Sequence, residues 1–151
     1  MEKEKLLISS CLLGELVKYN GSHNGFTQEI LQSLEQKYEL YSFCPEVEGG
    51  LPTPRIPCEI VSKVPLKVIN KEGFDKTNEF ILGAQKTLQL CTKYKIKKAL
   101  LKANSPSCSN EFVKDGTFSG VSVEGMGVTA GLLIKNQIEV FSEAEIEKLI
   151  F

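Results

Sequence analysis

The sequence lacks a long hydrophobic run, and it contains only one histidine and only one arginine. Such shortages exclude whole classes of protein. No segment approaches the roughly 18 consecutive apolar residues of a membrane span, and the apolar run near the amino terminus is too short for a signal-peptide core. The C-x2-C pairs of common structural zinc sites are absent, as is the G-x-x-x-x-G-K-S/T motif of phosphate-binding loops. We therefore expect a cytoplasmic protein without a membrane anchor or a nucleotide-binding loop.

An excess of charge of one sign is lacking too, because 18 lysines and arginines face 19 aspartates and glutamates, for a formal net charge of -1. A protein that coats nucleic acid carries an excess of basic residues, so no nucleic-acid partner is expected. A chain of 151 residues, 42% of them hydrophobic, can bury about 70% of the surface that its unfolded form exposes. We expect one domain over residues 1–151 that folds without disulfides or a structural metal.

Among reactive residues, cysteine is well represented, with five in the sequence. An odd count excludes complete pairing within the chain, and cytoplasmic cysteines are more often buried, metal-binding or catalytic than bridged. Cys91 falls on the apolar stripe of a predicted helix and is expected in the core. Cys58 follows Pro57 at the entry to a possible hairpin, and the pattern assigns it no role.

Hydrophobic patterns predict strands that alternate with helices along the chain. Short apolar runs predict buried strands at 6–8, 39–43, 99–101 and 138–141. Helical spacing and capping residues predict helices at 26–37, 77–91, 128–135 and 142–149. This order predicts an α/β, Rossmann-like fold with an open, mainly parallel sheet and helices on both faces. The proline- and glycine-rich segment around 47–72 is expected as a small irregular or hairpin insertion, and the glycine-rich stretch 116–127 as turns.

Three cysteines, Cys11, Cys44 and Cys108, each lie just beyond the carboxyl end of a predicted strand. In an open parallel sheet these ends share one edge, where ligands bind, so the three thiols are expected to meet. Converging thiolates repel one another unless a cation or a cluster binds them. Zinc would need His23 as a fourth ligand, whereas three thiolates alone suit an iron–sulfur cluster with one iron open to substrate. The alternative is that each cysteine is only a small buried hydrophobe.

Five further residues near this edge have two interpretations each. Glu46 is a candidate general acid or base, or an acceptor for loop N–H groups. Ser105 and Ser107 flank Pro106, and their hydroxyls are expected to bind substrate or to cap the loop, as is that of Ser10 before Cys11. The single arginine, Arg55, suits an anionic ligand or a salt bridge that ties its proline-rich loop down.

Together these stretches resemble the family catalogued as domain of unknown function 523, which includes the 2-thiouracil desulfurases. The matching segments, within about 6–142, are 9–14 (SSCLLG), 44–51 (CPEVEGGL), 54–57 (PRIP), 101–108, 115–120 and 127–130 (GVTA). The resemblance implies an oxygen-sensitive 4Fe-4S cluster that is held by Cys11, Cys44 and Cys108 and has one open iron. Such a cluster is readily lost from the protein in air. It also implies that Glu46 and Ser105 are catalytic, with Glu46 moving protons and helping water attack the carbon.

The activity implied by the resemblance is non-redox hydrolysis of a thiolated pyrimidine such as 2-thiouracil, or of a related thio-heterocycle, with sulfur released as sulfide. The candidate substrate-binding residues are Ser10, Ser107 and Arg55. The chain departs from the family pattern at Ser109, where glycine is common, and at Lys76. Two alternatives remain open from the residues: a non-catalytic iron–sulfur or metal-binding module, and an α/β module that binds a small ligand while its cysteines only pack.

Overall fold

A computed structural model describes residues 3–14 and 25–151 of the chain, so His23 lies outside the described residues. The elements are, in chain order, β1 (Glu4–Ser9), η1 (Ser10–Leu13), α1 (Gln28–Lys37), β2 (Tyr38–Phe43), α2 (Pro45–Glu48), β3 (Cys58–Lys63), β4 (Leu66–Asn70), α3 (Thr77–Tyr94), β5 (Lys98–Leu101), β6 (Phe112–Lys114), β7 (Ser122–Glu124), α4 (Val128–Lys135), β8 (Glu139–Ser142), η2 (Glu143–Glu145) and α5 (Glu147–Ile150). Within these residues, no helix combines the length and the apolar character that a membrane crossing requires.

The centre of the molecule is a parallel sheet of four strands in the order β2-β1-β5-β8. The predicted α/β fold with a parallel sheet is confirmed. The chain leaves β1 toward β2 on one side and leaves β5 toward β8 on the other, so the order reverses between β1 and β5. In open α/β sheets a crevice forms at such a reversal, outside the carboxyl ends of the strands.

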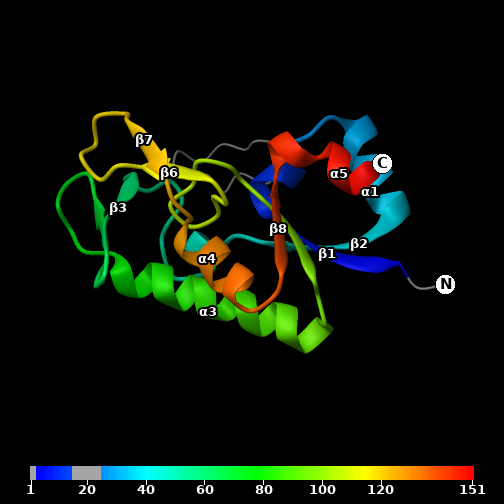
Figure 1. Ribbon diagram of the computed structural model, residues 1–151, viewed down its shortest axis with the longest axis horizontal. Coiled ribbons are helices and arrows are strands. Elements are labelled where there is room, and N and C mark those ends of the chain that lie inside the picture. The colour runs from blue at the N-terminus through cyan, green and yellow to red at the C-terminus, as the bar shows by residue number, and fades with distance from the viewer. Residues whose placement is uncertain (1–2, 15–24) are drawn as a thin grey trace.

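Helices cover both faces of this sheet, as predicted (Figure 1). One face packs against α3 and α4, with Leu7, Ala99 and Leu101 of the strands against Cys91 and Leu133 of the helices. The opposite face packs against η1, α1 and α5 through a second buried cluster that contains Leu6, Ile8, Leu12, Leu34, Leu100 and Leu149. The central strands β1 and β5 are short apolar runs because both of their faces are buried, whereas the edge strands β2 and β8 are partly exposed.

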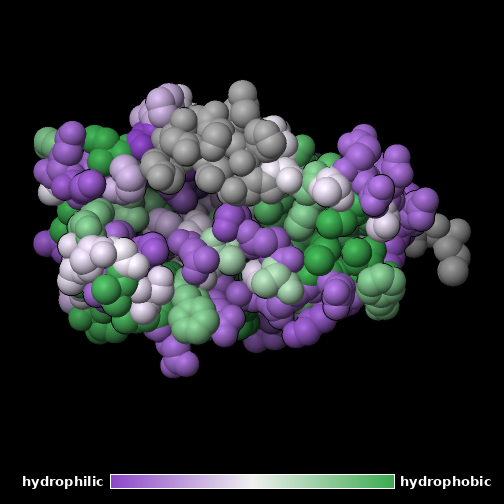
Figure 2. All heavy atoms as spheres, turned by 90° about the horizontal axis from the view of Figure 1, so that it is seen from above, coloured by the Kyte–Doolittle hydropathy of each residue, from purple (hydrophilic) through white to green (hydrophobic). Residues whose placement is uncertain are grey.

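Two antiparallel hairpins lie beside the sheet. The expected hairpin around Pro65 is present as β3 and β4, whereas the stretch 116–127, predicted as turns, also contributes to a second hairpin of β6 and β7. Ile60, Val68 and Val113 of the hairpins pack on Phe80 of α3. Every residue of β7 is exposed, and Figure 2 shows hydrophobic side chains reaching the surface at the hairpin end on the left.

The segment 45–57, predicted as an irregular loop, begins with the one-turn helix α2. This helix packs directly on α3, where Gly83 faces the backbone of Pro45 and Gly49 faces the backbone of Glu79. A methyl group on Gly83 would lie 2.8 Å from the carbonyl carbon of Pro45, so only glycine permits this approach. The contact fixes the position of the residues just after β2.

Two helix ends differ in detail from their predicted caps. Thr77 is the first residue of α3 and not its cap, and its hydroxyl accepts the N–H of Val68 at 2.9 Å. The predicted pair of Ser142 and Glu145 does form, with the Ser142 N–H donating to the Glu145 carboxylate at 3.1 Å. It begins the 3₁₀ turn η2 that leads into α5, so the last helical segment is shorter than expected.

Candidate active site

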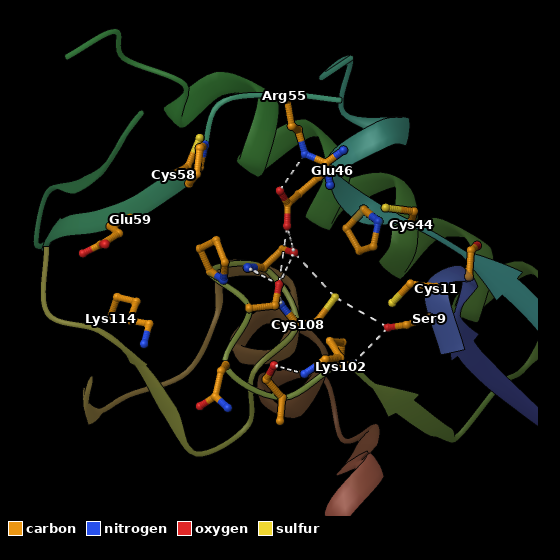
Figure 3. A pocket seen from close by; sticks show the side chains of 18 residues that line it. Ser9, Cys11, Cys44, Glu46, Arg55, Cys58, Glu59, Lys102, Cys108 and Lys114 are labelled. Carbon is orange, nitrogen blue, oxygen red and sulfur yellow. Dashed lines mark hydrogen bonds and ion pairs between the residues drawn. The ribbon is translucent and has the colours of Figure 1, made fainter. Parts of the chain in front are cut away.

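A cavity of about 340 Å³ lies at the carboxyl ends of β1, β2 and β5 (Figure 3). Its lining comes from the end of β1 with η1, from the start of α2, from the loop after β5, and from the two hairpins. The lining residues with reactive or charged side chains are Cys11, Cys44, Cys58, Cys108, Glu46, Glu59, Arg55, Lys102 and Lys114. The cavity is therefore at the edge of the sheet where the sequence predicts a site.

Cys11, Cys44 and Cys108 all line this cavity, as the position of each after a strand predicts. Cys11 and Cys108 are buried and Cys44 is half-buried, and none of the three forms a disulfide within the described residues. In Figure 3 their sulfur atoms point toward a common space on the right side of the cavity. The convergence is thus a property of the fold, because separate elements supply each cysteine.

The chemistry of these three donors can be compared with what metal sites need. Among residues 3–14 and 25–151, no three histidine, cysteine or carboxylate side chains close on a point where a single metal ion could bind. Thiolates are the ligands that iron–sulfur clusters use, so the donor set fits such a cluster.

The loop that carries Cys108 is held by the start of α4. The N–H of Val128 donates to the carbonyl of Pro106 at 2.9 Å, and the N–H groups of Thr129 and Ala130 donate to that of Ser107 at 2.9 and 3.0 Å. These amides at a helix start have no partner within the helix, so the loop satisfies them and is fixed in return. A methyl group on Gly127, the residue before α4, would lie 2.6 Å from the Ser107 carbonyl oxygen. Glycine is therefore required where α4 approaches the loop.

Burial makes two of the proposed ligands, Cys108 and Cys44, weaker acids. Burial raises the pKa of Cys108 to about 12, against the lowering effect of hydrogen bonds from Ser107 and Ser9. Burial also raises the pKa of Cys44, and the backbone N–H of Val47 offsets this in part. A thiol of this kind binds iron only after it loses its proton, so the surroundings of each sulfur decide how well it binds.

Glu46 lies at the centre of a hydrogen-bond network inside the cavity. Its Oε2 accepts the Ser107 hydroxyl at 2.8 Å and lies 3.4 Å from the Ser105 hydroxyl. The Ser105 oxygen in turn accepts the N–H groups of Ser107 and Cys108 at 3.1 Å each. Ser105 therefore caps the loop, as one interpretation predicts, and keeps its own proton available for donation.

Arg55 forms an ion pair with the other oxygen of Glu46. Its Nε donates to Glu46 Oε1 at 3.1 Å, and both side chains are largely buried, at 6% and 13% exposure. The terminal Nη1 donates to the Pro52 carbonyl and to the Thr53 hydroxyl at 3.2 Å each. These contacts correspond to the salt-bridge interpretation of Arg55, and they fix both the loop and the catalytic candidate Glu46.

The remaining cysteines have different surroundings. Cys91 is 1% exposed and packs in the core as predicted, and burial raises its pKa to about 11. Cys58 lines the cavity but lies on the side opposite Cys11 (Figure 3). Burial is the main cause that raises the pKa of Cys58 to about 11, with the negative charge of Glu46 adding to it.

Three charged residues of the cavity were not predicted from the sequence. Glu59 is 8% exposed and accepts the N–H groups of Gly116 and Phe118 at 3.0 and 3.2 Å, which joins the two hairpins. Lys102 pairs with Glu143 at 2.8 Å, and Lys114 lines the wall formed by β6. No local pattern marks Glu59 and Lys114, because the hairpins reach the sheet edge only through tertiary packing, whereas Lys102 directly follows β5.

Comparisons with known proteins match nearly the whole chain. A family model described as 2-thiouracil desulfurase matches residues 6–145. The uncharacterized protein YbbK of Bacillus subtilis (strain 168) is 38% identical over 152 residues, which cover 96% of this chain and 99% of YbbK. A solved structure of a 4Fe-4S-dependent thiouracil desulfidase, TudS, is 44% identical with a TM-score of 0.91, over 97% of this chain and 95% of TudS.

Proposed function

Since this chain belongs to the 2-thiouracil desulfurase family, we propose that it removes sulfur from a thiolated pyrimidine, or a related thio-heterocycle, with the help of a 4Fe-4S cluster. The observation that carries the proposal is the convergence of three thiols and one carboxylate on one cavity. Cys11, Cys44 and Cys108 are the proposed ligands. Three ligands leave one iron open, and that iron would act as a Lewis acid toward the sulfur of the substrate.

The proposed reaction is hydrolysis without net oxidation or reduction. The oxygen of a water molecule forms a bond to the thiocarbonyl carbon, and the bond between that carbon and sulfur breaks. The products are the corresponding carbonyl compound and sulfide. Two protons must move, because water loses them and the departing sulfur gains them, so the site needs a group that both accepts and donates protons.

Glu46 is the proposed proton carrier. Its Oε2 faces the cavity among hydroxyls, while Arg55 holds Oε1, so the carboxylate has one fixed and one reactive oxygen. Water that attacks the carbon would give its proton to Oε2, and the same oxygen would return the proton to the sulfur. The Arg55 guanidinium holds the carboxylate in place through the 3.1 Å ion pair with Oε1.

Ser105, Ser107 and Ser10 are the proposed groups that orient the ring. The Ser105 oxygen is anchored by two backbone N–H groups, and its proton is directed at Glu46 Oε2 over 3.4 Å, a long bond that a ring nitrogen or oxygen of the substrate would replace. Ser107 already donates to Glu46, which makes it a link between the substrate region and the carboxylate. Ser10 lines the cavity beside Cys11. Arg55 acts on the substrate through Glu46.

Anaerobic purification with iron and sulfide analysis tests the cluster, and release of sulfide from 2-thiouracil tests the reaction. We expect iron in the wild-type protein and sulfide release with uracil as the second product. Replacing Cys11, Cys44 and Cys108 together by alanine should remove the iron. The matched control is Cys91→Ala, which also removes a buried thiol but lies in the core against α4.

Glu46→Gln separates an enzyme from a non-catalytic cluster protein. Glutamine keeps the size of the side chain but cannot carry a proton, so iron content should stay and sulfide release should fall by about 100-fold or more. A protein that binds no iron after anaerobic reconstitution would refute the proposal. So would a wild-type protein that holds iron yet releases no sulfide from any thio-heterocycle tested.

A further inference from the structure

Ser9 is a buried cavity residue for which neither the catalytic proposal nor the family match gives a role. It is the last residue of β1, it is 3% exposed, and it lies where β1 and β5 begin to separate. The N–H of Lys102, just past β5, donates to the Ser9 oxygen at 3.1 Å. The same oxygen lies 3.7 Å from the sulfur of Cys108. Ser9 thus bridges the end of the sheet and a proposed ligand.

The backbone bond fixes the direction of the Ser9 proton. A hydroxyl has one proton to donate and lone pairs that accept. Because the Lys102 N–H occupies the acceptor side of Ser9, the proton is directed at the remaining neighbour, which is the Cys108 sulfur (Figure 3). A cysteine that binds iron is a thiolate without a proton, so in the loaded protein Ser9 can only be the donor.

Ser107 is the other hydroxyl within hydrogen-bonding distance of that sulfur in the described part of the chain, and its proton is shared with a second acceptor. It lies 3.5 Å from the Cys108 sulfur and 2.8 Å from the Glu46 carboxylate. A carboxylate is the stronger acceptor, and one hydroxyl cannot donate fully to both. Ser107 is therefore shared between Glu46 and Cys108, whereas Cys108 is the acceptor that faces the Ser9 proton.

We propose that Ser9 is a positioning residue that stabilises Cys108 as an iron ligand through an O–H···S hydrogen bond. The proposal rests on the proposed 4Fe-4S function. Hydrogen bonds to the sulfurs of a cluster are among the features that set its reduction potential, because they stabilise the added negative charge of the reduced form. Such partners also hold the cluster in place, and their loss commonly costs about 10- to 100-fold in metal affinity. Ser9 is expected to act on both properties.

Ser9→Ala tests this in the reconstituted protein. We expect the variant to bind a cluster that titrates at a more negative potential and that loses iron to a chelator about tenfold faster than the wild type. If the hydrogen bond favours the reduced form tenfold, the shift is about 59 mV for one electron. Ser9→Thr keeps the hydroxyl and should restore the wild-type potential.

Thr87→Val is the matched control. It also deletes a buried hydroxyl, one that donates to the Gly83 carbonyl within α3, outside the cavity lining. We expect it to lower thermal stability without moving the potential. If the role of Ser9 is purely structural, Ser9→Ala will also lower thermal stability and leave the reduction potential unchanged. That result would overturn the proposal.

A measurement on the wild-type protein covers the case in which Ser9→Ala does not load. The hydroxyl proton exchanges with solvent, so the iron–cysteine stretching bands in the resonance Raman spectrum should shift in D₂O. Bands that stay unchanged would overturn the role of Ser9 while leaving the cluster itself established. A wild-type protein without iron would instead overturn both this proposal and the function on which it rests.

Discussion

Gly83→Ala should damage the site although Gly83 does not line the cavity. Gly83 in α3 faces the backbone of Pro45 in α2, and an added methyl group would overlap the Pro45 carbonyl oxygen and lie 2.8 Å from its carbonyl carbon. Carbon atoms in ordinary contact are about 3.5–4.0 Å apart, so the helices must separate by about 1 Å. Both clashing partners are rigid backbone, and no side-chain rotation relieves the overlap.

The energetic and catalytic costs follow from that displacement. Overpacking of this kind costs about 1–3 kcal/mol, against a gain of about 1 kcal/mol for alanine over glycine in a helix. Because α2 moves as a unit, Cys44 and Glu46 on either side of Pro45 are displaced with it. A shift of about 1 Å at reacting groups can lower a rate by about 100-fold, so sulfide release should fall to that extent.

Gly131→Ala in α4 is the control for Gly83→Ala. It brings the same gain in helix propensity, and the nearest atom to its added methyl group is the Met126 Cβ at 3.9 Å, an ordinary contact. Denaturant titration of both variants should give free energies of unfolding that differ by about 1–3 kcal/mol, with Gly131→Ala the more stable. Equal stability and equal sulfide release in the two variants would refute the argument that this contact positions the site.

Three further predictions use the same measurements. Gly127→Ala should increase iron loss to a chelator, because its methyl group would press on the loop that carries Cys108; unchanged retention would contradict this. Cys58→Ala should keep the iron content of the wild type, since Cys58 lies across the cavity from Cys11, and a loss of iron would make it a ligand. Burial raises the pKa of Cys91 to about 11, so its contribution to stability is complete below about pH 9 and is lost as pH rises toward 11. Between pH 8 and about 11, the free energy of unfolding should therefore fall less steeply for Cys91→Ala than for the wild type. Parallel pH dependences of the two proteins would contradict the prediction.

The sheet and the meeting of the cysteines were predictable because both depend on strongly marked local patterns. Each core strand is a short apolar run, and parallel strands that alternate with helices place their carboxyl ends at one edge. Cys44 directly follows its strand and Cys11 lies three residues after Ile8, so the shared strand edge predicts their meeting, whereas Cys108 lies seven residues after Leu101 on a loop whose path the pattern does not give. The helical stripe that contains Cys91 marked it as a core residue for the same reason.

The hairpin side of the cavity was less predictable. The one turn of α2 is too short to show a helical period, and it lies in a proline- and glycine-rich stretch that is typical of loops. The strands β6 and β7 have three residues each, which is too few for a clear alternation. Glu59 reaches the cavity because the hairpins pack on α3, and that is a long-range contact. Arg55 had two reasonable interpretations, and only the position of Glu46 in space distinguishes them.

The two segments that carry the proton-transfer groups also carry proposed ligands. Cys44 and Glu46 flank Pro45 at the start of α2, and Ser105 precedes Cys108 by three residues on one loop. The hydrogen bonds of Glu46 with the loop hydroxyls join these two segments directly. Any displacement of either segment therefore changes ligand geometry and proton transfer together. Cys11, on η1 after β1, is the exception, because its segment carries no proposed proton carrier. Substitutions at Cys11 should consequently alter iron binding without altering the Glu46 network, which makes this cysteine the place where the two contributions can be separated.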